Sequence, residues 1–154
     1  MTSVEMPQNS DTDVLIMGGG LAGLTLALQL RRRRAAVRIS VLERNRFPVP
    51  VASHKIGEST VEIGANYFSE VLGLKEHLDE QHLRKFGFRF FFSEGQRNLD
   101  EVTEIGVSRP MATPSYQIDR GVFENFLAER ARAEGITLIE AASVRQIDLA
   151  ADGE

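Results

Sequence analysis

Residues 13–42 show a regular succession of apolar segments. Residues 13–17 form a short apolar run rich in strand formers that stops at three glycines, which predicts a buried strand. Residues 21–33 are apolar on most sides, as expected for a helix packed on a sheet. Residues 37–42 are again rich in strand formers. The pattern predicts a βαβ unit with two parallel strands.

The middle of the chain is less regular. Residues 44–60 read as a loop, and residues 61–81 as a helix that breaks near Leu72 and Gly73. Residues 86–92 predict a strand, because phenylalanines at 86, 88, 90 and 92 alternate with other residues. We expect these rings to belong to the sheet core rather than to contact a substrate. Residues 93–114 are rich in turn formers and predict neither a helix nor a strand.

The C-terminal third predicts one helix and two strands. Apolar residues from Phe123 to Ala131 follow helical spacing, and Gly135 stands where a glycine commonly ends a helix. Residues 137–140 and 143–149 read as strands. The turn signal at residues 151–153 has no returning strand after it. We therefore expect the chain to be the N-terminal portion of a longer protein.

Composition narrows the class of protein. The 154 residues are 42% hydrophobic and 26% charged, with a net charge of −4. This is the composition of a globular domain without attraction for nucleic acid or anionic membranes. No apolar run is long enough to span a bilayer, and no leader is evident. We therefore expect a cytoplasmic protein with a flexible tail over 1–12 and one domain over 13–154. There is no cysteine, and the three histidines (His54, His77 and His82) do not indicate a metal site.

A G-x-G-x-x-G motif joins the first strand to the first helix. Gly18 permits the tight turn, Gly20 admits a pyrophosphate to the backbone, and Gly23, which follows Ala22, lets the helix approach the sheet. Glu43 ends the second strand, where a carboxylate can accept hydrogen bonds from a ribose. The motif in this context predicts a dinucleotide site. The alternative is a glycine-rich turn that binds nothing.

Four arginines at the end of the first helix, Arg31 to Arg34, could be taken for a 2′-phosphate site of NADP. A solvated helix end is the better interpretation, since cations there oppose the helix dipole. Glu43 would also repel a 2′-phosphate. An NAD(P)-dependent dehydrogenase is therefore disfavoured.

Three further segments carry a resemblance to a known family. They are Glu43-Arg44, residues 55–60 (KIGEST) and residues 116–120 (YQIDR). Together with the glycine motif, they resemble the N-terminal part of FAD-dependent halogenases within the aromatic hydroxylase superfamily. The resemblance runs from about residue 13 to residue 149. It implies an incomplete α/β, Rossmann-like FAD/NAD(P)-binding domain with a parallel sheet and added antiparallel strands.

The resemblance implies FAD as cofactor and assigns residues to it. The glycine motif would hold the pyrophosphate and Glu43 the adenosine ribose, with Arg44 beside the adenine half. Arg120 would face the cofactor, and the backbone of Val144 would meet the adenine. Four residues would line the flavin side: Gly57, Glu58, Ser59 and Thr60. For the last segment an N-cap of the next helix is an alternative, and for Arg120 an ordinary surface arginine.

Lys85 is the candidate catalytic residue. It precedes an aromatic residue and a glycine, and it lies 27 positions beyond Glu58, a setting similar to that of the halogenase lysine. The resemblance implies that halide is oxidised to hypohalous acid through a flavin C4a-hydroperoxide. Lys85 would then hydrogen-bond the hypohalous acid or form a haloamine, and an electron-rich aromatic would be halogenated. A lysine whose ammonium reaches solvent is the alternative.

Several family features are missing from this chain. It has no tryptophan, so the halogenase W-x-W-x-I-P motif is not present, and the glycine-aspartate segment for the flavin is also missing. We therefore expect the fragment itself to be inactive. The expected partners are halide, an aromatic or carrier-tethered substrate and a separate flavin reductase. An FAD-dependent monooxygenase, a prenyl-type reductase and a non-catalytic truncated nucleotide-binding module remain as alternatives.

Overall fold

The computed structural model describes residues 12–52, 54–109 and 111–147. It divides into two compact units, each taken by itself below. Unit 1 comprises Met1–Ser53 and Arg120–Glu154, and unit 2 comprises His54–Asp119. Among the described residues, no helix has the length and apolar character that a membrane span requires.

Unit 1 is a small parallel sheet covered by two helices. Its elements are β1 (Val14–Met17), α1 (Leu21–Arg33), β2 (Ile39–Leu42), α4 (Arg120–Ala133) and β7 (Thr137–Ile139). The strand order is β1-β2-β7, and both neighbouring pairs are parallel. The predicted βαβ unit is therefore present, with its second strand beginning at Ile39 rather than at residue 37.

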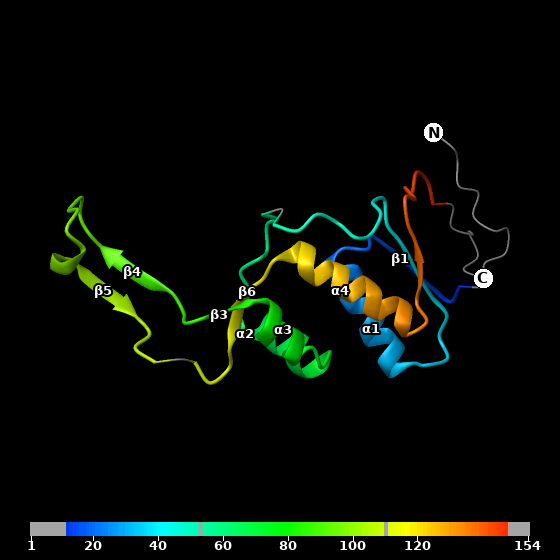
Figure 1. Cartoon of the computed structure of the whole chain (residues 1–154), viewed down its shortest axis with the longest axis horizontal. Helices are drawn as coiled ribbons and strands as arrows, with labels where there is room; N and C mark the ends of the chain where they lie inside the picture. The colour runs from blue at the N-terminus through cyan, green and yellow to red at the C-terminus, as the bar shows by residue number, and fades with distance from the viewer. Residues whose placement is uncertain (1–11, 53, 110, 148–154) are drawn as a thin grey trace. The chain divides into compact units, whose positions relative to one another are not determined.

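The core of unit 1 lies between the sheet and its helices. Helices α1 and α4 lie side by side (Figure 1) and share contacts along their lengths. Leu24, Leu28, Phe123 and Leu127 are all fully buried there. Since side chains alternate along a strand, Ile16 of β1 is buried while its neighbours Leu15 and Met17 are 50% and 57% exposed.

Helix α4 ends as the sequence predicted. Gly135 has φ of 75°, and its N–H donates to the carbonyl of Arg132. The next amide, that of Ile136, donates to the carbonyl of Ala131. This pair of bonds is a Schellman motif, which a glycine favours because the left-handed conformation costs it nothing.

Unit 2 is built from short elements. Helix α2 (Glu62–Asn66), the π-helical turn η1 (Tyr67–Val71) and α3 (Lys75–Gln81) replace the single helix expected over 61–81, with the predicted interruption at residues 72–74. The remaining elements are β3 (Leu83–Lys85), β4 (Arg89–Phe92), η2 (Leu99–Glu101), β5 (Thr103–Gly106) and β6 (Ser115–Gln117). Strand β3 pairs antiparallel with β6, and β4 pairs antiparallel with β5.

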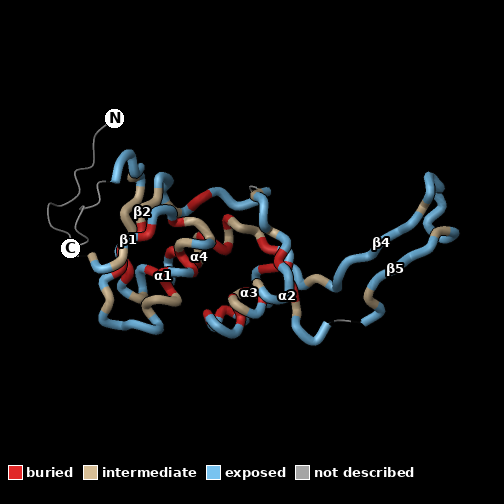
Figure 2. Tube along the Cα trace, turned by 180° about the vertical axis from the view of Figure 1, so that it is seen from behind, coloured by how far each residue is buried: buried red, intermediate tan, exposed pale blue. Residues whose placement is uncertain are grey.

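The phenylalanine-rich segment differs from the expectation. Only residues 89–92 form a strand, and the expected assignment of the alternating phenylalanines to the sheet core is wrong for this structure. Phe88, Phe90 and Phe92 are 57–66% exposed, and Phe86 is 44% exposed. The reason is that β4 pairs with β5 alone, so the two-stranded ribbon lacks a covering layer among the described residues (Figure 2).

The C-terminal end also departs from the expectation. Residues 143–147 contain no strand, although the sequence predicted one over 143–149. The expected turn at residues 151–153 and the expected flexible tail, apart from Thr12, lie outside the described residues. Strands β3 and β6 were not predicted, because three residues are too few to show a period.

Candidate functional site

The glycine loop of unit 1 has the geometry that the motif requires. Gly18 adopts φ of 111°, which favours glycine, and its N–H donates to the carbonyl of Leu42 at 2.8 Å. A Cβ on Gly23 would lie 1.9 Å from the carbonyl oxygen of Gly18, so only glycine lets α1 start this close to β1. A Cβ on Gly20 would meet nothing nearer than 3.8 Å. The atoms nearest to this position thus belong to the side chains of Arg120 and Glu124, at ordinary contact distance.

Glu43 points at this loop. Its Oε2 accepts the N–H of Gly19 at 2.7 Å, and its Oε1 accepts both the backbone N–H and the side-chain Nδ2 of Asn45 at 2.9 Å. A Cβ on Gly19 would lie 2.8 Å from Cβ of Glu43, so this position needs a glycine too. The sequence interpretation missed Gly19 and Asn45, because the motif leaves both positions unspecified.

Arg120 lies beside the same loop. Its Nη2 and Oε1 of Glu124 are each 3.8 Å from the Cβ position of Gly20. Both residues come from the first turns of α4, four positions apart, which places them on one face of the helix. The side chain of Arg120 is 23% exposed and pairs with Glu124, and its assignment to the cofactor remains a prediction. The buried Glu124 is a residue that the sequence did not reveal.

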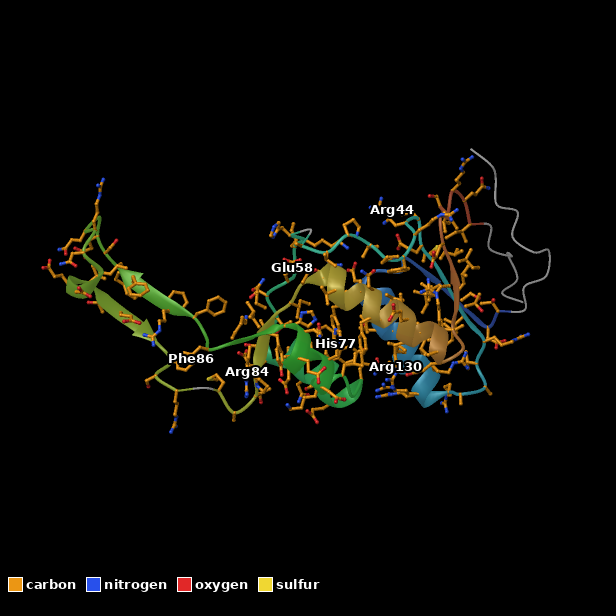
Figure 3. All side chains as sticks on the ribbon, viewed as in Figure 1. Arg44, Glu58, His77, Arg84, Phe86 and Arg130 are labelled. Carbon is orange, nitrogen blue, oxygen red and sulfur yellow. The ribbon has the colours of Figure 1, made fainter. Side chains whose placement is uncertain are left out.

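Three other residues of unit 1 that were assigned to the cofactor are exposed. Arg44 is exposed on the turn after β2 (Figure 3), Ala22 is exposed in the first turn of α1, and Val144 is 43% exposed. Their assignments to the cofactor remain predictions.

The 57–60 segment lies in unit 2. Gly57 adopts φ of 90°, and the side chain of Glu58 accepts the N–H of Lys55 at 3.2 Å. The N-cap interpretation of Ser59 and Thr60 is wrong, because α2 is capped by Val61 without a side-chain bond. In Figure 3, Glu58 lies on the coil segment that precedes α2.

Thr60 ties this segment to β6. Its N–H donates to the carbonyl of Tyr116 at 2.9 Å, and its hydroxyl accepts the N–H of Tyr116 at 2.7 Å. Its hydroxyl also donates to the same carbonyl at 3.0 Å. Beyond it, Ile118 donates its N–H to the carbonyl of Glu58. These bonds give the segment a fixed backbone.

Lys85 contacts the same segment. Its Nζ donates to Oγ of Ser59 at 2.8 Å and to the carbonyl oxygen of Thr60 at 2.5 Å. It also lies 5.2 Å from the centre of the Phe88 ring, within reach of a cation–π interaction. The structure thus brings the half-buried Lys85 into contact with Ser59 and Thr60, which lie 26 and 25 positions earlier in the sequence.

Tyr116 is part of the core of unit 2. Its ring is fully buried, and its hydroxyl donates to Oδ1 of Asp79 at 2.6 Å. Burial, together with that hydrogen bond, raises the pKa of Tyr116 to about 12. Lys75, and then the Tyr116 hydroxyl, lower the pKa of Asp79. The sequence motif marked Tyr116 as part of the family resemblance but not as a buried anchor.

The histidines do not form a metal centre. His77 and His82 stack edge to face with ring centres 5.3 Å apart. Burial lowers the pKa of His77 to about 4 and also lowers the pKa of His82. Within the part of the chain that the structure describes, no three histidine, cysteine or acidic side chains are grouped as metal ligands would be.

Comparison with protein families identifies the class of this domain. The family model described as "FAD binding domain" matches residues 11–153. The chain belongs to this family of FAD-binding domains, as the resemblance implied.

Relatives of known function include flavin-dependent halogenases. A flavin-dependent halogenase of Dictyostelium discoideum is 31% identical over 143 residues, which cover 88% of this chain and 24% of that protein. A chlorinase of Pseudomonas fluorescens that acts on 1H-pyrrole-2-carbonyl-peptidyl-carrier protein is 26% identical over 93% of this chain and 34% of its own length. The chain thus spans between a quarter and a third of these relatives.

Solved structures agree with the fold. The myxobacterial chondrochloren halogenase matches with a TM-score of 0.64 and 28% identity, over 84% of this chain and 28% of that one. The flavin-dependent halogenase CmlS matches with a TM-score of 0.65 and 25% identity, over 88% of this chain and 23% of that one. The expected fold class is confirmed: an α/β domain with a parallel sheet and added antiparallel pairs.

Proposed function

We propose that this chain is the FAD-binding portion of a flavin-dependent halogenase and that it holds the adenosine diphosphate half of FAD at the glycine loop. One observation carries the proposal: in the loop from β1 to α1, Arg120 lies beside Gly20 and the carboxylate of Glu43 accepts the N–H of Gly19. The family match and the halogenase relatives support the same interpretation.

The residues of unit 1 fit that half of the cofactor. Gly20 has no side chain, so a diphosphate would approach its backbone closely, and Arg120 provides a cation beside it. Oε2 of Glu43 uses one lone pair on Gly19, and a carboxylate oxygen can accept a second hydrogen bond, here from a ribose hydroxyl. Arg44 and the backbone of Val144 would lie toward the adenine.

Lys85 is the proposed catalytic residue. Bound and reduced FAD would supply the reducing equivalents that let oxygen oxidise halide to hypohalous acid. An ammonium has three N–H donors, and Lys85 uses two of them on Ser59 and Thr60 among the described residues. The third would donate to hypohalous acid and polarise it toward an electron-rich aromatic ring.

The substrate and the partners follow from the same family. One relative acts on a pyrrole carried by a peptidyl-carrier protein, which supports an aromatic substrate that is free or tethered to a carrier. Halide and a flavin reductase that delivers reduced FAD complete the proposed set of partners. The 57–60 segment, held by Lys85 and Tyr116, would line the flavin side.

Titration of this chain with FAD tests the cofactor assignment. Flavin fluorescence should be quenched on binding, with FAD preferred over NADP because Glu43 repels a 2′-phosphate. Glu43→Ala should weaken FAD binding by about tenfold or more, the loss of one or two charge-assisted hydrogen bonds. The exposed Glu129→Ala on α4 is the control. Absence of FAD binding, both here and in a longer protein containing this chain, would refute the proposal.

The catalytic assignment is tested in a protein of the relatives' length that contains this chain. Lys85→Ala should reduce halogenated product at least about a hundredfold, the typical contribution of a positioned proton donor, without slowing flavin reduction. Lys75→Ala, an exposed lysine of α3, is the matched control. Undiminished halogenation would remove Lys85 from the mechanism. A hydroxylated product in the unaltered protein would instead assign it to the monooxygenases.

A further inference from the structure

Glu124 is the buried carboxylate that the proposed function does not yet use. The residue is 3% exposed, and its Oε1 accepts three hydrogen bonds. Two come from Nε and Nη2 of Arg120, with the Nε bond at 3.0 Å. The third comes from the backbone N–H of Leu21, the first residue of α1, at 3.3 Å.

This arrangement compensates for a missing cap on α1. The N-cap residue Gly20 has no side chain, and the first turn of α1 contains no acidic residue. Amides at a helix start lack partners within the helix and favour a negative charge. Glu124 supplies that charge from α4, a hundred residues away in sequence, and so joins the start of α1 to the start of α4.

The same contacts orient Arg120. Oε1 of Glu124 accepts from both Nε and Nη2 of Arg120, and this restrains one edge of the planar guanidinium. The guanidinium is thereby held beside the Cβ position of Gly20. Without Glu124, a long arginine side chain would distribute over several rotamers, and holding it in one costs conformational entropy.

A second pair on α4 fixes the adjacent loop. Gly121 directly follows Arg120 in α4, and Asn125 directly follows Glu124. The side chain of Asn125 accepts the N–H of Val49 at 2.7 Å and donates to its carbonyl at 2.9 Å. A Cβ on Gly121 would lie 2.2 Å from the carbonyl oxygen of Pro50. The first turns of α4 are therefore held rigidly, and the backbone of Arg120 has a fixed position.

We propose that Glu124 is a positioning residue for the diphosphate of the cofactor: it presents the guanidinium of Arg120 to the glycine loop. This inference rests on the proposed FAD-binding function. Glu124 also carries a negative charge next to the loop, so its benefit comes through Arg120 and not through direct contact with the ligand. The inference concerns the diphosphate alone and not the adenine or the ribose.

Binding of FAD, ADP and adenosine to Glu124→Ala separates positioning from a structural role. The variant should bind FAD and ADP about tenfold or more weakly, as expected when a charge-assisted contact loses its orientation. Adenosine, which lacks the diphosphate, should bind unchanged. Glu124→Gln keeps the Oε1 acceptor and should restore most of the affinity. Glu129→Ala, the exposed glutamate of the same helix, should change nothing.

A double-mutant cycle with Arg120→Ala completes the test. If Glu124 acts through Arg120, the double variant should bind ADP no more weakly than Arg120→Ala alone. Should Glu124→Ala fail to fold, Glu124→Asp decides, because the shorter side chain withdraws the carboxylate and should weaken ADP binding while adenosine is unaffected. Equal loss for ADP and adenosine, or no loss, would overturn the inference. Absence of FAD binding by the unaltered sequence, both as this chain and within a longer protein, would instead refute the proposed function.

Discussion

The glycine loop of unit 1 and the β4–β5 ribbon of unit 2 are built on opposite principles. The loop is a region of close backbone approach, where Cβ atoms on Gly19 or Gly23 would collide with neighbours. The ribbon carries a dense group of phenylalanines, yet its residues are exposed on both strands. The region with the fewest side-chain atoms is thus the better packed of the two.

The difference shows that apolar periodicity predicts which side chains share a face but not whether that face is buried. The alternation in residues 86–92 predicts an apolar face of a strand, and burial of that face requires a second layer of structure. In unit 1 that layer exists, since α1 packs on β1 and β2 and α4 packs on β7, and Ile16 and Val41 are buried. Four predictions test whether this contrast between the regions holds.

The largest effect should come from the core of unit 1. Phe123 is fully buried in α4, so Phe123→Ala should lower the free energy of unfolding by about 3–5 kcal/mol through lost transfer energy and a cavity. Urea denaturation followed by circular dichroism measures this loss. A change below about 1 kcal/mol would mean that α4 is not packed as described.

Acidification should act on unit 2, which contains all three histidines. The pKa of folded His77, about 4, lies below its ordinary 6.5, so protonation favours the unfolded state. Stability is unaffected above about pH 7 and falls as the pH drops through 6.5. The loss for His77 near pH 4 should stay below about 3 kcal/mol, because solvent screens its half-buried ring. The lowered pKa of His82 acts in the same direction.

Amide hydrogen exchange, corrected for the intrinsic exchange rates, measures this loss of stability region by region. Amides of α3 and β6 should lose protection between pH 7.5 and pH 5. His77→Gln, which cannot take up a proton, should reduce the dependence. A pH profile identical to that of the unaltered chain would exclude His77 as its source.

Gly23→Ala tests the close approach in the loop. Its Cβ would overlap the carbonyl oxygen of Gly18, and the required shift of α1 should cost about 1–3 kcal/mol. Gly64→Ala is the matched control, because Gly64 lies in α2 with nothing within 4 Å of its Cβ position. That variant should be neutral or gain up to about 1 kcal/mol. Equal midpoints in urea for both variants would contradict the packing.

The smallest effect should come from the ribbon. Phe90 is 58% exposed, so Phe90→Ser should change the free energy of unfolding by less than about 0.5 kcal/mol. The variant should also be more soluble, since it removes apolar surface. A loss comparable to that of Phe123→Ala, measured by the same urea titration, would show that the ribbon is covered in solution.

Local signals in the sequence determined much of this protein. The apolar run before three glycines, the helix after them and the second strand predicted the βαβ unit, because these features depend on residues close in sequence. Gly135 marked the end of α4 through its freedom to adopt the left-handed conformation. The glycine motif and Glu43 indicated the dinucleotide site, and the 55–60 segment indicated the halogenase relatives.

The tertiary structure alone decided which distant residues meet. Lys85 reaches Ser59, Glu43 reaches Gly19, and Glu124 reaches the first amide of α1. It also decided that the phenylalanines of β4 are exposed. The physical reason is that burial and hydrogen bonding are properties of pairs of surfaces, whereas a sequence pattern describes only one member of each pair.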